Sequence, residues 1–203
     1  MIDYKKDYKA LYLPKNKPEL IEIPEMTFVM LEGEGDPNGE TFGTETEALF
    51  SFSYAVKMSY KGSDIPEGYY EYTVCPLEGE WDLIDKSKGL VDKSNLKYKL
   101  MIRQPEFVTQ EVFTHFIEKI KKKKPNAYYD RIQLVTLTEG LCCQMLHLGS
   151  YDDEPASFDA MEAYCKAQGY QRLSKRHREI YLSDPRKTAK EKLKTVLRFK
   201  VGN

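Results

Sequence analysis

The sequence predicts an α+β protein of two similar halves, each built as strand, helix, strand, strand, with a ligand groove where the halves meet. Short stretches rich in β-branched and aromatic residues alternate with amphipathic helical stretches, and this order occurs twice along the chain. The composition, 41% hydrophobic and 31% charged, is that of a globular protein. Two modules with half-covered sheets bury apolar surface by docking, and a cleft between them is the expected result.

Charge and hydropathy exclude several classes of protein. The 203 residues include 31 basic and 32 acidic side chains, and this net charge of −1 does not favour nucleic acid as a partner. No apolar run is long enough to span a membrane, and the N-terminal stretch lacks the apolar core of a signal peptide. We therefore expect a single domain over residues 1–203, located in the cytoplasm, with neither nucleic acid nor membrane as a partner.

The first half begins with an arm and a strand. Residues 1–25 mix Lys, Tyr and Pro and are expected to form an extended arm. The first module, residues 26–104, then opens with a strand over 26–33, which is rich in Phe, Val and Leu. After a loop of Gly, Asp, Pro and Asn, a helix is expected from Thr44, because its hydroxyl and the Glu47 carboxylate form a capping-box pattern.

Periodicity and β-propensity predict the rest of this module. Leu49, Phe52 and Val56 recur at intervals of three and four, which indicates one buried helical face. The other predicted elements are a strand over 69–75 (YYEYTVC), an irregular connection over 77–95 and a strand over 97–103 (KYKLMIR).

A helical connector leads into a second module with the same order of elements. The connector spans residues 105–130, and its helix over 109–122 has one apolar face and a lysine-rich end. The stretch 132–137 fits a strand or the end of the connector equally well. Within the second module, residues 131–201, we predict a strand over 142–149, a helix from Pro155 to about Gly169, strands over 178–182 and 195–201, and a short helical turn over 188–193.

The cysteines and histidines do not indicate a metal site. Cys75, Cys142, Cys143 and Cys165 include no CxxC pair, and the three histidines are scattered without an HExxH motif. In a reducing compartment such thiols are most often small buried apolar groups. The sequence therefore predicts neither a metal nor an organic cofactor.

Several longer motifs resemble one known family. The segments GSYDDEPASFDAMEAYCKAQGY and HREIYLSDPRKTAKEKLKTVLRFKV are similar to the C-terminal half of GyrI-like small-molecule-binding proteins. The segment KALYLPKNKPELIEIPEMTFVMLEGEGDPNG, together with PLEGEWD around Trp81, resembles one bacterial subgroup of that family. The resemblance covers the chain from about Leu11 to Val201.

The resemblance implies a pseudo-twofold arrangement of the two modules, with a ligand in the groove between them. Members of the resembled subgroup are implicated in resistance to DNA-alkylating cyclopropanoid compounds related to yatakemycin. The resemblance therefore implies hydrolysis of the strained cyclopropane, with the ligand held in an aromatic cage and an acidic residue taking part. Other stand-alone members are associated with modulation of gyrase. Some members are fused to DNA-binding domains, for which these 203 residues leave no room, so a direct transcription-factor role is not expected.

Glu179 is the predicted catalytic residue. In the strand REIYL, alternation is expected to pack Ile180 and Leu182 under the helices and to turn Glu179 and Tyr181 to the other side. If that side faces the cleft, partial burial raises the pKa of the carboxyl towards a value useful for proton transfer. The alternative is an exposed strand glutamate, and only the resemblance favours the functional interpretation.

The predicted ligand-binding residues are mostly aromatic. Trp81, the only tryptophan, offers a large stacking face and one N–H donor, although a core anchor is its ordinary role. Tyr151 follows a glycine turn and is either a cage wall or a loop-packing residue. The other candidates are Tyr181 beside Glu179, Tyr54 and Phe50 one turn apart on the first helix, and Glu71 in the strand that matches REIYL.

Other charged groups have simpler interpretations. Phe50 is more readily a core residue, and Glu71 a solvated one. The acidic run Asp152 to Glu154 is most simply a set of charges at the N-terminus of the following helix. The lysines at 121–124 are most simply a solvated helix end, and without interleaved aromatic residues they are weak evidence for nucleic acid.

Two functional hypotheses therefore stand. In the first, a flat, hydrophobic, electrophilic xenobiotic binds between Trp81 and tyrosines, and Glu179 activates the water that opens it. In the second, the protein sequesters or senses hydrophobic or cationic compounds without chemistry, with Glu179 as counter-ion. A docking role on gyrase ranks last, because no exposed docking patch is evident in the sequence.

Overall fold

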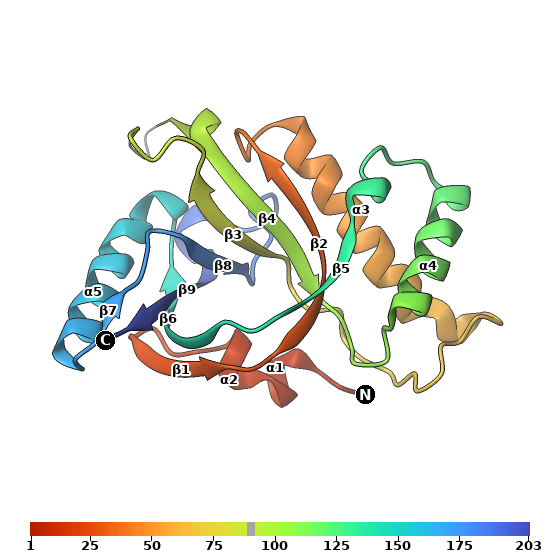
Figure 1. The fold of residues 1–203 in the computed structure, drawn as a ribbon, viewed down its shortest axis with the longest axis horizontal. Coiled ribbons are helices and arrows are strands. Elements are labelled where there is room, and N and C mark those ends of the chain that lie inside the picture. The colour runs from red at the N-terminus through yellow and green to blue at the C-terminus, as the bar shows by residue number, and fades with distance from the viewer. Residues whose placement is uncertain (89–91) are drawn as a thin grey trace.

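The structure, a computed structural model, describes residues 1–88 and 92–203 and consists of one large curled sheet with helices (Figure 1). The strands of the described chain are β1 (Glu19–Ile23), β2 (Met26–Glu34), β3 (Glu78–Leu83), β4 (Leu96–Arg103), β5 (Gln133–Leu137), β6 (Gly140–Leu148), β7 (Gln171–Arg172), β8 (His177–Tyr181) and β9 (Lys194–Gly202). They pair in the order β1-β6-β9-β8-β3-β4-β2-β5, with β7 added on β9.

The helices are grouped around this sheet. They are α1 (Tyr4–Asp7), α2 (Lys9–Tyr12), α3 (Glu40–Lys57), α4 (Gln110–Lys123) and α5 (Glu154–Ala167). Five short 3-10 turns complete the described chain: η1 (Met58–Lys61), η2 (Lys93–Asn95), η3 (Tyr129–Arg131), η4 (Tyr151–Asp153) and η5 (Lys190–Lys192). None of the described helices is long and apolar enough to cross a membrane.

The predicted α+β fold of two strand-helix-strand-strand modules is confirmed. The first module is β2-α3-β3-β4 and the second is β6-α5-β8-β9. From the centre of the sheet outwards, β3, β4 and β2 mirror β8, β9 and β6, which is the order expected for a pseudo-twofold axis between β3 and β8. These two strands are antiparallel, and Gly79 pairs with Glu179 while Trp81 pairs with His177. The modules therefore share one sheet, with its seam at β3–β8.

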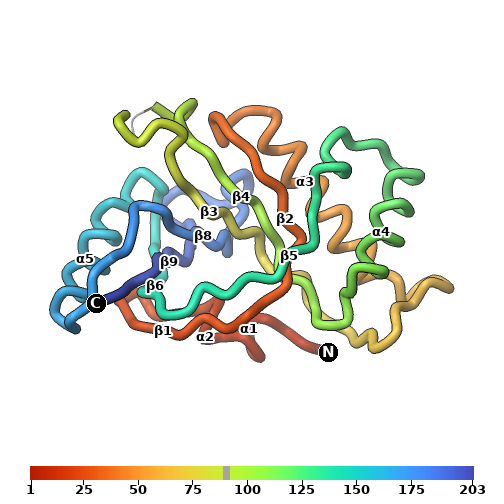
Figure 2. The backbone as a smooth tube through the Cα atoms, in the orientation of Figure 1, coloured from red at the N-terminus to blue at the C-terminus, as the bar shows by residue number. Residues whose placement is uncertain are grey.

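Each outer edge of this sheet is completed by a strand from elsewhere in the chain. Strand β1 of the N-terminal arm pairs with β6 of the second module, and β5 pairs with β2 of the first module (Figure 2). The segment 132–137 is thus a strand, and it extends the first module's sheet although it precedes β6 directly. The arm, predicted as extended, instead contains α1, α2 and β1.

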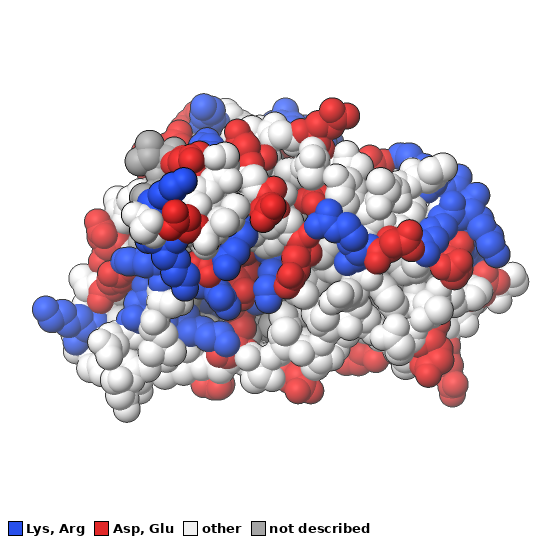
Figure 3. Space-filling model, turned by 45° about the horizontal axis from the view of Figure 1, so that its top comes forward, with Lys and Arg blue, Asp and Glu red and all other residues white. Residues whose placement is uncertain are grey.

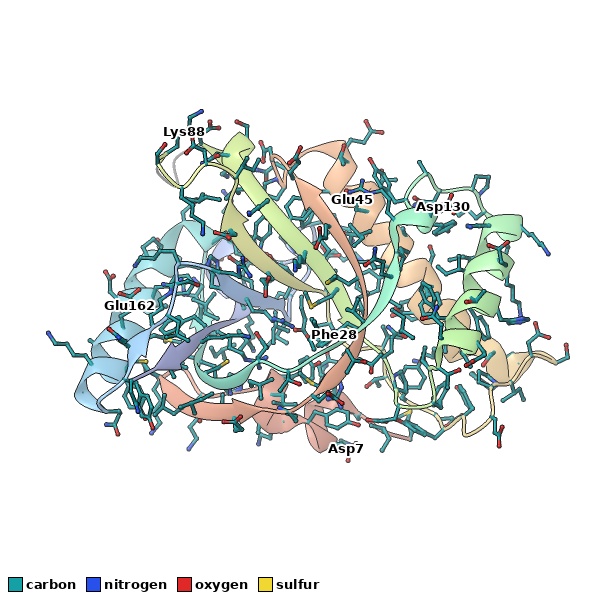
Figure 4. All side chains as sticks on the ribbon, viewed as in Figure 1. Asp7, Phe28, Glu45, Lys88, Asp130 and Glu162 are labelled. Atoms are coloured by element: carbon teal, nitrogen blue, oxygen red, sulfur yellow. The ribbon has the colours of Figure 1, made fainter. Side chains whose placement is uncertain are left out.

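The helices α3 and α5 cover the same face of the sheet, on either side of the seam (Figure 1). The predicted face of α3 is buried: Leu49, Phe52 and Val56 pack with residues of β2 and β4. On α5, Met161 and Cys165 pack with residues of β6 and β9. Figure 4 shows Glu45 on α3 and Glu162 on α5, at the two sides of the central strands.

The opposite face of the seam holds a buried polar network beneath the arm. Arg178 on β8 donates to Glu78 on β3 (Nη1–Oε2, 2.9 Å), and the Tyr12 hydroxyl of α2 donates to the same carboxylate (3.0 Å). Glu139 lies between Arg178 and Arg198, at 3.3 and 3.4 Å. The guanidinium groups are almost fully buried, so their charges depend on these carboxylates.

Three further sequence predictions are wrong at the level of elements. Residues 69–75 are not a strand: Tyr72 makes an isolated bridge to Ile2, and the tyrosines of this segment pack around Phe107. The segment predicted as irregular contains β3. The first long helix begins at Glu40 rather than Thr44, whose hydroxyl donates to the Glu40 carbonyl oxygen inside the helix instead of capping it.

Basic and acidic side chains are interspersed over the face of the molecule drawn in Figure 3. Most ion pairs of the described chain are exposed contacts of this kind, such as Lys119 with Asp64 and Lys99 with Glu32. Exposed pairs add little stability. The charges at the seam differ, because they are buried.

Candidate functional site

Alternation along β8 divides its side chains between the two faces of the seam. Arg178 and Ile180 are buried on the face beneath the arm, whereas Glu179 faces α5, as do its neighbours at positions 177 and 181. The predicted alternation is therefore present, but the two sets of side chains lie on the opposite faces of the sheet from those predicted. Ile180 does not pack under the helices, and the carboxylate lies on the helix-covered face.

Glu179 is held by hydrogen bonds to its carboxylate. The Tyr181 hydroxyl lies 2.8 Å from Oε2 and donates to it, and His177 Nε2 lies 3.0 Å from Oε1. A third contact comes from the carboxyl group of Glu154, in the first turn of α5. The Glu179 side chain is only 13% exposed. These contacts fix the position of both carboxylate oxygens.

Tyr181 links Glu179 to the single tryptophan. The Trp81 indole Nε1–H donates to the Tyr181 hydroxyl oxygen at 2.8 Å, and that hydroxyl donates onwards to Glu179. Burial and the nearby Glu179 charge raise the pKa of Tyr181 well above its ordinary value. The phenol therefore stays protonated and remains a hydrogen-bond donor.

Glu154 is the second carboxyl group of the site. It is 6% exposed, and burial, with the charge of Glu179 as the second cause, raises its pKa to about 10. At neutral pH Glu154 is therefore protonated and serves as a donor to Glu179. Two carboxyl groups thus meet at this point, and Glu154 carries a proton.

Aromatic rings enclose this carboxyl pair on both modules. Trp81 stacks on Phe42 of α3, with ring centroids 6.0 Å apart and an interplanar angle of 20°. Tyr151, in η4, meets Tyr181 edge-on at 6.1 Å. Phe158 of α5 meets the His177 ring at 4.8 Å. A carboxylate in an aromatic enclosure suits a flat apolar or cationic ligand.

The predicted aromatic residues of α3 lie farther along that helix than Phe42. Phe50 and Tyr54 follow Phe42 at intervals of eight and twelve residues, and at 3.6 residues per turn they are rotated by about 80° and 120° from it around the helix axis. Their own rings are 6.2 Å apart, and Tyr54 is 49% exposed. A ligand contact of Phe50 and Tyr54 stays a prediction.

Glu71 is exposed and lies apart from the carboxyl pair. It belongs to the segment that packs against the arm, where its backbone carbonyl accepts a hydrogen bond from Ile2 N. The predicted match between its segment and REIYL is wrong, because β3, not 69–75, is the counterpart of β8.

The structure thus brings Glu179, Trp81, Tyr151 and Tyr181 together, and adds His177 and Glu154, which the sequence analysis missed. The alternation of HREIY places His177 on the face of Glu179, so this signal was available. For Glu154 no such signal existed, since it ends an acidic run that fits a helix N-terminus.

The carboxyl pair of Glu154 and Glu179 is largely enclosed. Trp81 is 7% exposed, and the described surface hollows lie elsewhere, one of them about 820 Å³ beside Glu162 and Arg172 of α5 and β7. Tyr151 lies against Tyr181 on a single 3-10 turn between β6 and α5.

The described residues offer no evident set of ligands for a metal ion. Residues 1–88 and 92–203 contain no cluster of three or more His, Cys, Asp or Glu side chains placed to hold an ion. The four cysteines are buried thiols.

Comparison with known proteins places these observations in a family. A model of the GyrI-like small molecule binding domain matches residues 16–201. No curated protein matches the chain. The solved structure of a hydrolase from Listeria innocua is 38% identical to this chain over 100% of both chains, with a TM-score of 0.92. A second hydrolase from that organism, encoded by lin2189, is 40% identical over 99% of both chains, also with a TM-score of 0.92. An uncharacterized conserved protein from the same organism is 40% identical over 100% of both chains, with a TM-score of 0.94.

Proposed function

We propose a function for this chain, which belongs to the GyrI-like small-molecule-binding family. It binds flat hydrophobic xenobiotics at the seam and hydrolyses cyclopropanoid DNA-alkylating compounds. The observation that carries the proposal is the buried Glu179 carboxyl group held by Tyr181 and His177 inside an aromatic enclosure. The hydrolase names of two Listeria innocua proteins, 38% and 40% identical, favour chemistry over binding alone.

The proposed reaction adds one water molecule across the strained ring. Trp81 and Tyr151 stack on the flat ligand and place its cyclopropane beside Glu179. The Glu179 carboxylate takes a proton from water as the water oxygen bonds to the ring methylene carbon. The ring carbon–carbon bond breaks, its electron pair moves to the conjugated carbonyl oxygen, and that oxygen takes a proton from solvent, to which Glu179 later returns its own.

Hydrolysis is tested by incubating the protein with a yatakemycin-type cyclopropanoid in ordinary and ¹⁸O-labelled water, followed by mass spectrometry. We expect a water-addition product that carries the heavy oxygen and forms faster than in the protein-free control. Glu179→Gln should keep ligand affinity and slow product formation by about 100-fold or more, the usual scale of general-base assistance. Glu32→Gln, on the exposed edge of β2, is the matched control and should react at the wild-type rate.

A second function, sequestration without chemistry, is favoured by the combination of one negative charge with aromatic faces. Its outcome in the same experiment is unchanged compound in a tight complex. Glu179→Gln then weakens binding of cationic ligands, whereas an enzyme variant keeps its affinity and loses turnover. Unchanged, unbound compound contradicts both functions.

A further inference from the structure

Two carboxyl groups at the seam come from different elements and meet in a buried place. Glu179 projects from β8, and Glu154 projects from the first turn of α5 onto it. Glu154 Oε1 is fully enclosed and has no hydrogen-bond partner. A carboxyl oxygen buried without a partner is unusual in folded proteins. We call this arrangement the carboxyl pair.

The surroundings of the carboxyl pair contain little positive charge. From β8 it is faced by His177, at 3.0 Å from Glu179, and by the neutral Tyr181. From η4 it is faced by Tyr151 and by the negative charge of Asp152. Across residues 1–88 and 92–203, no Lys or Arg forms an ion pair with either carboxyl group. The second negative charge therefore lacks a counter-ion in the ligand-free protein.

We propose that a positively charged ligand bound at the carboxyl pair expels the proton that Glu154 and Glu179 share, whereas an uncharged ligand leaves it in place. The proposal rests on the proposed binding of small molecules at this site. Two adjacent carboxylates repel each other, and the shared proton removes that repulsion. A ligand cation removes it equally well, so cation and proton compete for the same pair.

Competition of this kind has a measurable consequence. If binding releases one proton, the affinity for the cation rises about tenfold for each pH unit, because proton and ligand affect each other's binding reciprocally. The affinity for an uncharged ligand of the same shape stays constant over that range. Glu154 thus determines which ligand charge the site prefers at a given pH.

The shared proton is tested in the ligand-free protein by ¹³C NMR of chain labelled at glutamate Cδ. We expect one glutamate resonance with the chemical shift of a protonated carboxyl group at neutral pH, absent from the spectrum of Glu154→Gln. A spectrum in which every glutamate is ionised at neutral pH overturns the proposal. Otherwise unchanged spectra show that the variant is folded.

Proton release is tested by titration calorimetry near pH 8 in buffers of different ionisation enthalpy. The probes are N-methylphenanthridinium, a flat cation, and phenanthridine, its uncharged counterpart. We expect close to one proton released per bound cation and none per bound phenanthridine. Glu154→Gln should bind both probes and release no proton with either.

The outcomes separate this proposal from the proposed function. If neither probe binds to the wild type, the site does not bind small molecules of this class, and the proposed function fails. If both bind and the cation releases no proton, only the shared-proton proposal fails. Release that persists in Glu154→Gln assigns the proton to another group, His177 being the nearest, and also overturns the proposal.

Discussion

Glu154 lies two residues after Asp152 in one acidic run, yet only Glu154 is buried. The sequence indicates only helix N-terminal charge for the whole run, because it does not show that Tyr151–Asp153 forms a separate 3-10 turn before α5. Glu154 follows that turn as the first residue of α5 and contacts Glu179. Burial of a carboxyl without a counter-ion costs stability and is typical of functional sites.

The first prediction at this scale concerns stability and pH. In the unfolded chain Glu154 has its ordinary pKa, near 4.3, whereas its pKa in the folded protein is about 10. Between these values the folded state holds a proton that the unfolded state has lost. Stability therefore falls as pH rises, by up to about 1.4 kcal/mol per pH unit from this group. Glu154→Gln should be more stable than the wild type near pH 8, by urea denaturation.

The same comparison near pH 5 is the control, because there the difference between Glu154→Gln and the wild type should shrink to about 1 kcal/mol. A constant difference at both pH values contradicts the protonation of Glu154 in the folded state.

At the residue scale the sequence predicted a cluster around Glu179 that the structure assembles from both modules. Alternation placed Tyr181 beside it, the family resemblance pointed to Trp81, and the position after a glycine turn pointed to Tyr151. The sequence did not predict which face of the sheet these residues occupy. The face depends on whether α5 or the arm covers that side of β8, and neither packing contact is encoded in the alternation itself.

At the scale of elements, β3 shows how tertiary pairing overrides propensity. Its sequence EGEWDL is rich in residues that are rare in strands, whereas YYEYTVC has strong strand propensity and forms none. β3 is stabilised by pairing with β4 on one side and β8 on the other. The helix α4 was predictable because its apolar period is regular, and Thr109 caps it through a hydrogen bond from Val112 N.

The prediction at this scale concerns Gly79 on β3. A Cβ there would lie 2.7 Å from Trp81 Nε1 and 3.1 Å from the Tyr181 hydroxyl. Gly79→Ala should therefore displace the indole, destabilise the protein by about 1–3 kcal/mol and weaken ligand binding, because overpacking forces buried side chains to move. Thermal unfolding and ligand titration measure the two effects.

Gly43, on the exposed side of α3, provides the matched control. A Cβ there meets nothing within 4 Å, so Gly43→Ala should stabilise the helix by up to about 1 kcal/mol and leave ligand binding unchanged. Binding that is normal in Gly79→Ala contradicts the role of Trp81 in the site.

At the scale of the molecule, the exchange of edge strands ties the two modules together. The arm completes the second module through β1, and β5 completes the first. The predicted module boundaries rest on strands that pair within their own part of the sequence. The pairing of β1 with β6 was therefore not predicted. Long-range pairing of this kind has no local signal in composition or periodicity.

The prediction at this scale concerns the buried network beneath the arm. Glu78→Gln removes the charge that Arg178 and Tyr12 contact, and leaves the buried Arg178 with Glu139 alone. We expect the free energy of unfolding, measured by urea denaturation, to fall by about 3 kcal/mol, because breaking a buried ion pair leaves a buried charge without compensation. Glu80→Gln, two residues along β3, removes only a long contact to Arg176 and should cost less than about 1 kcal/mol. Equal losses contradict the importance of the network.

Because the chain has one tryptophan and its indole nitrogen donates to the hydroxyl that contacts Glu179, the protein carries its own optical reporter. Indole emission responds to changes at its N–H group and to rings stacked against it. A ligand that enters between the modules therefore changes the intrinsic fluorescence without any added dye. Compound collections are thus open to direct screening on the unmodified protein.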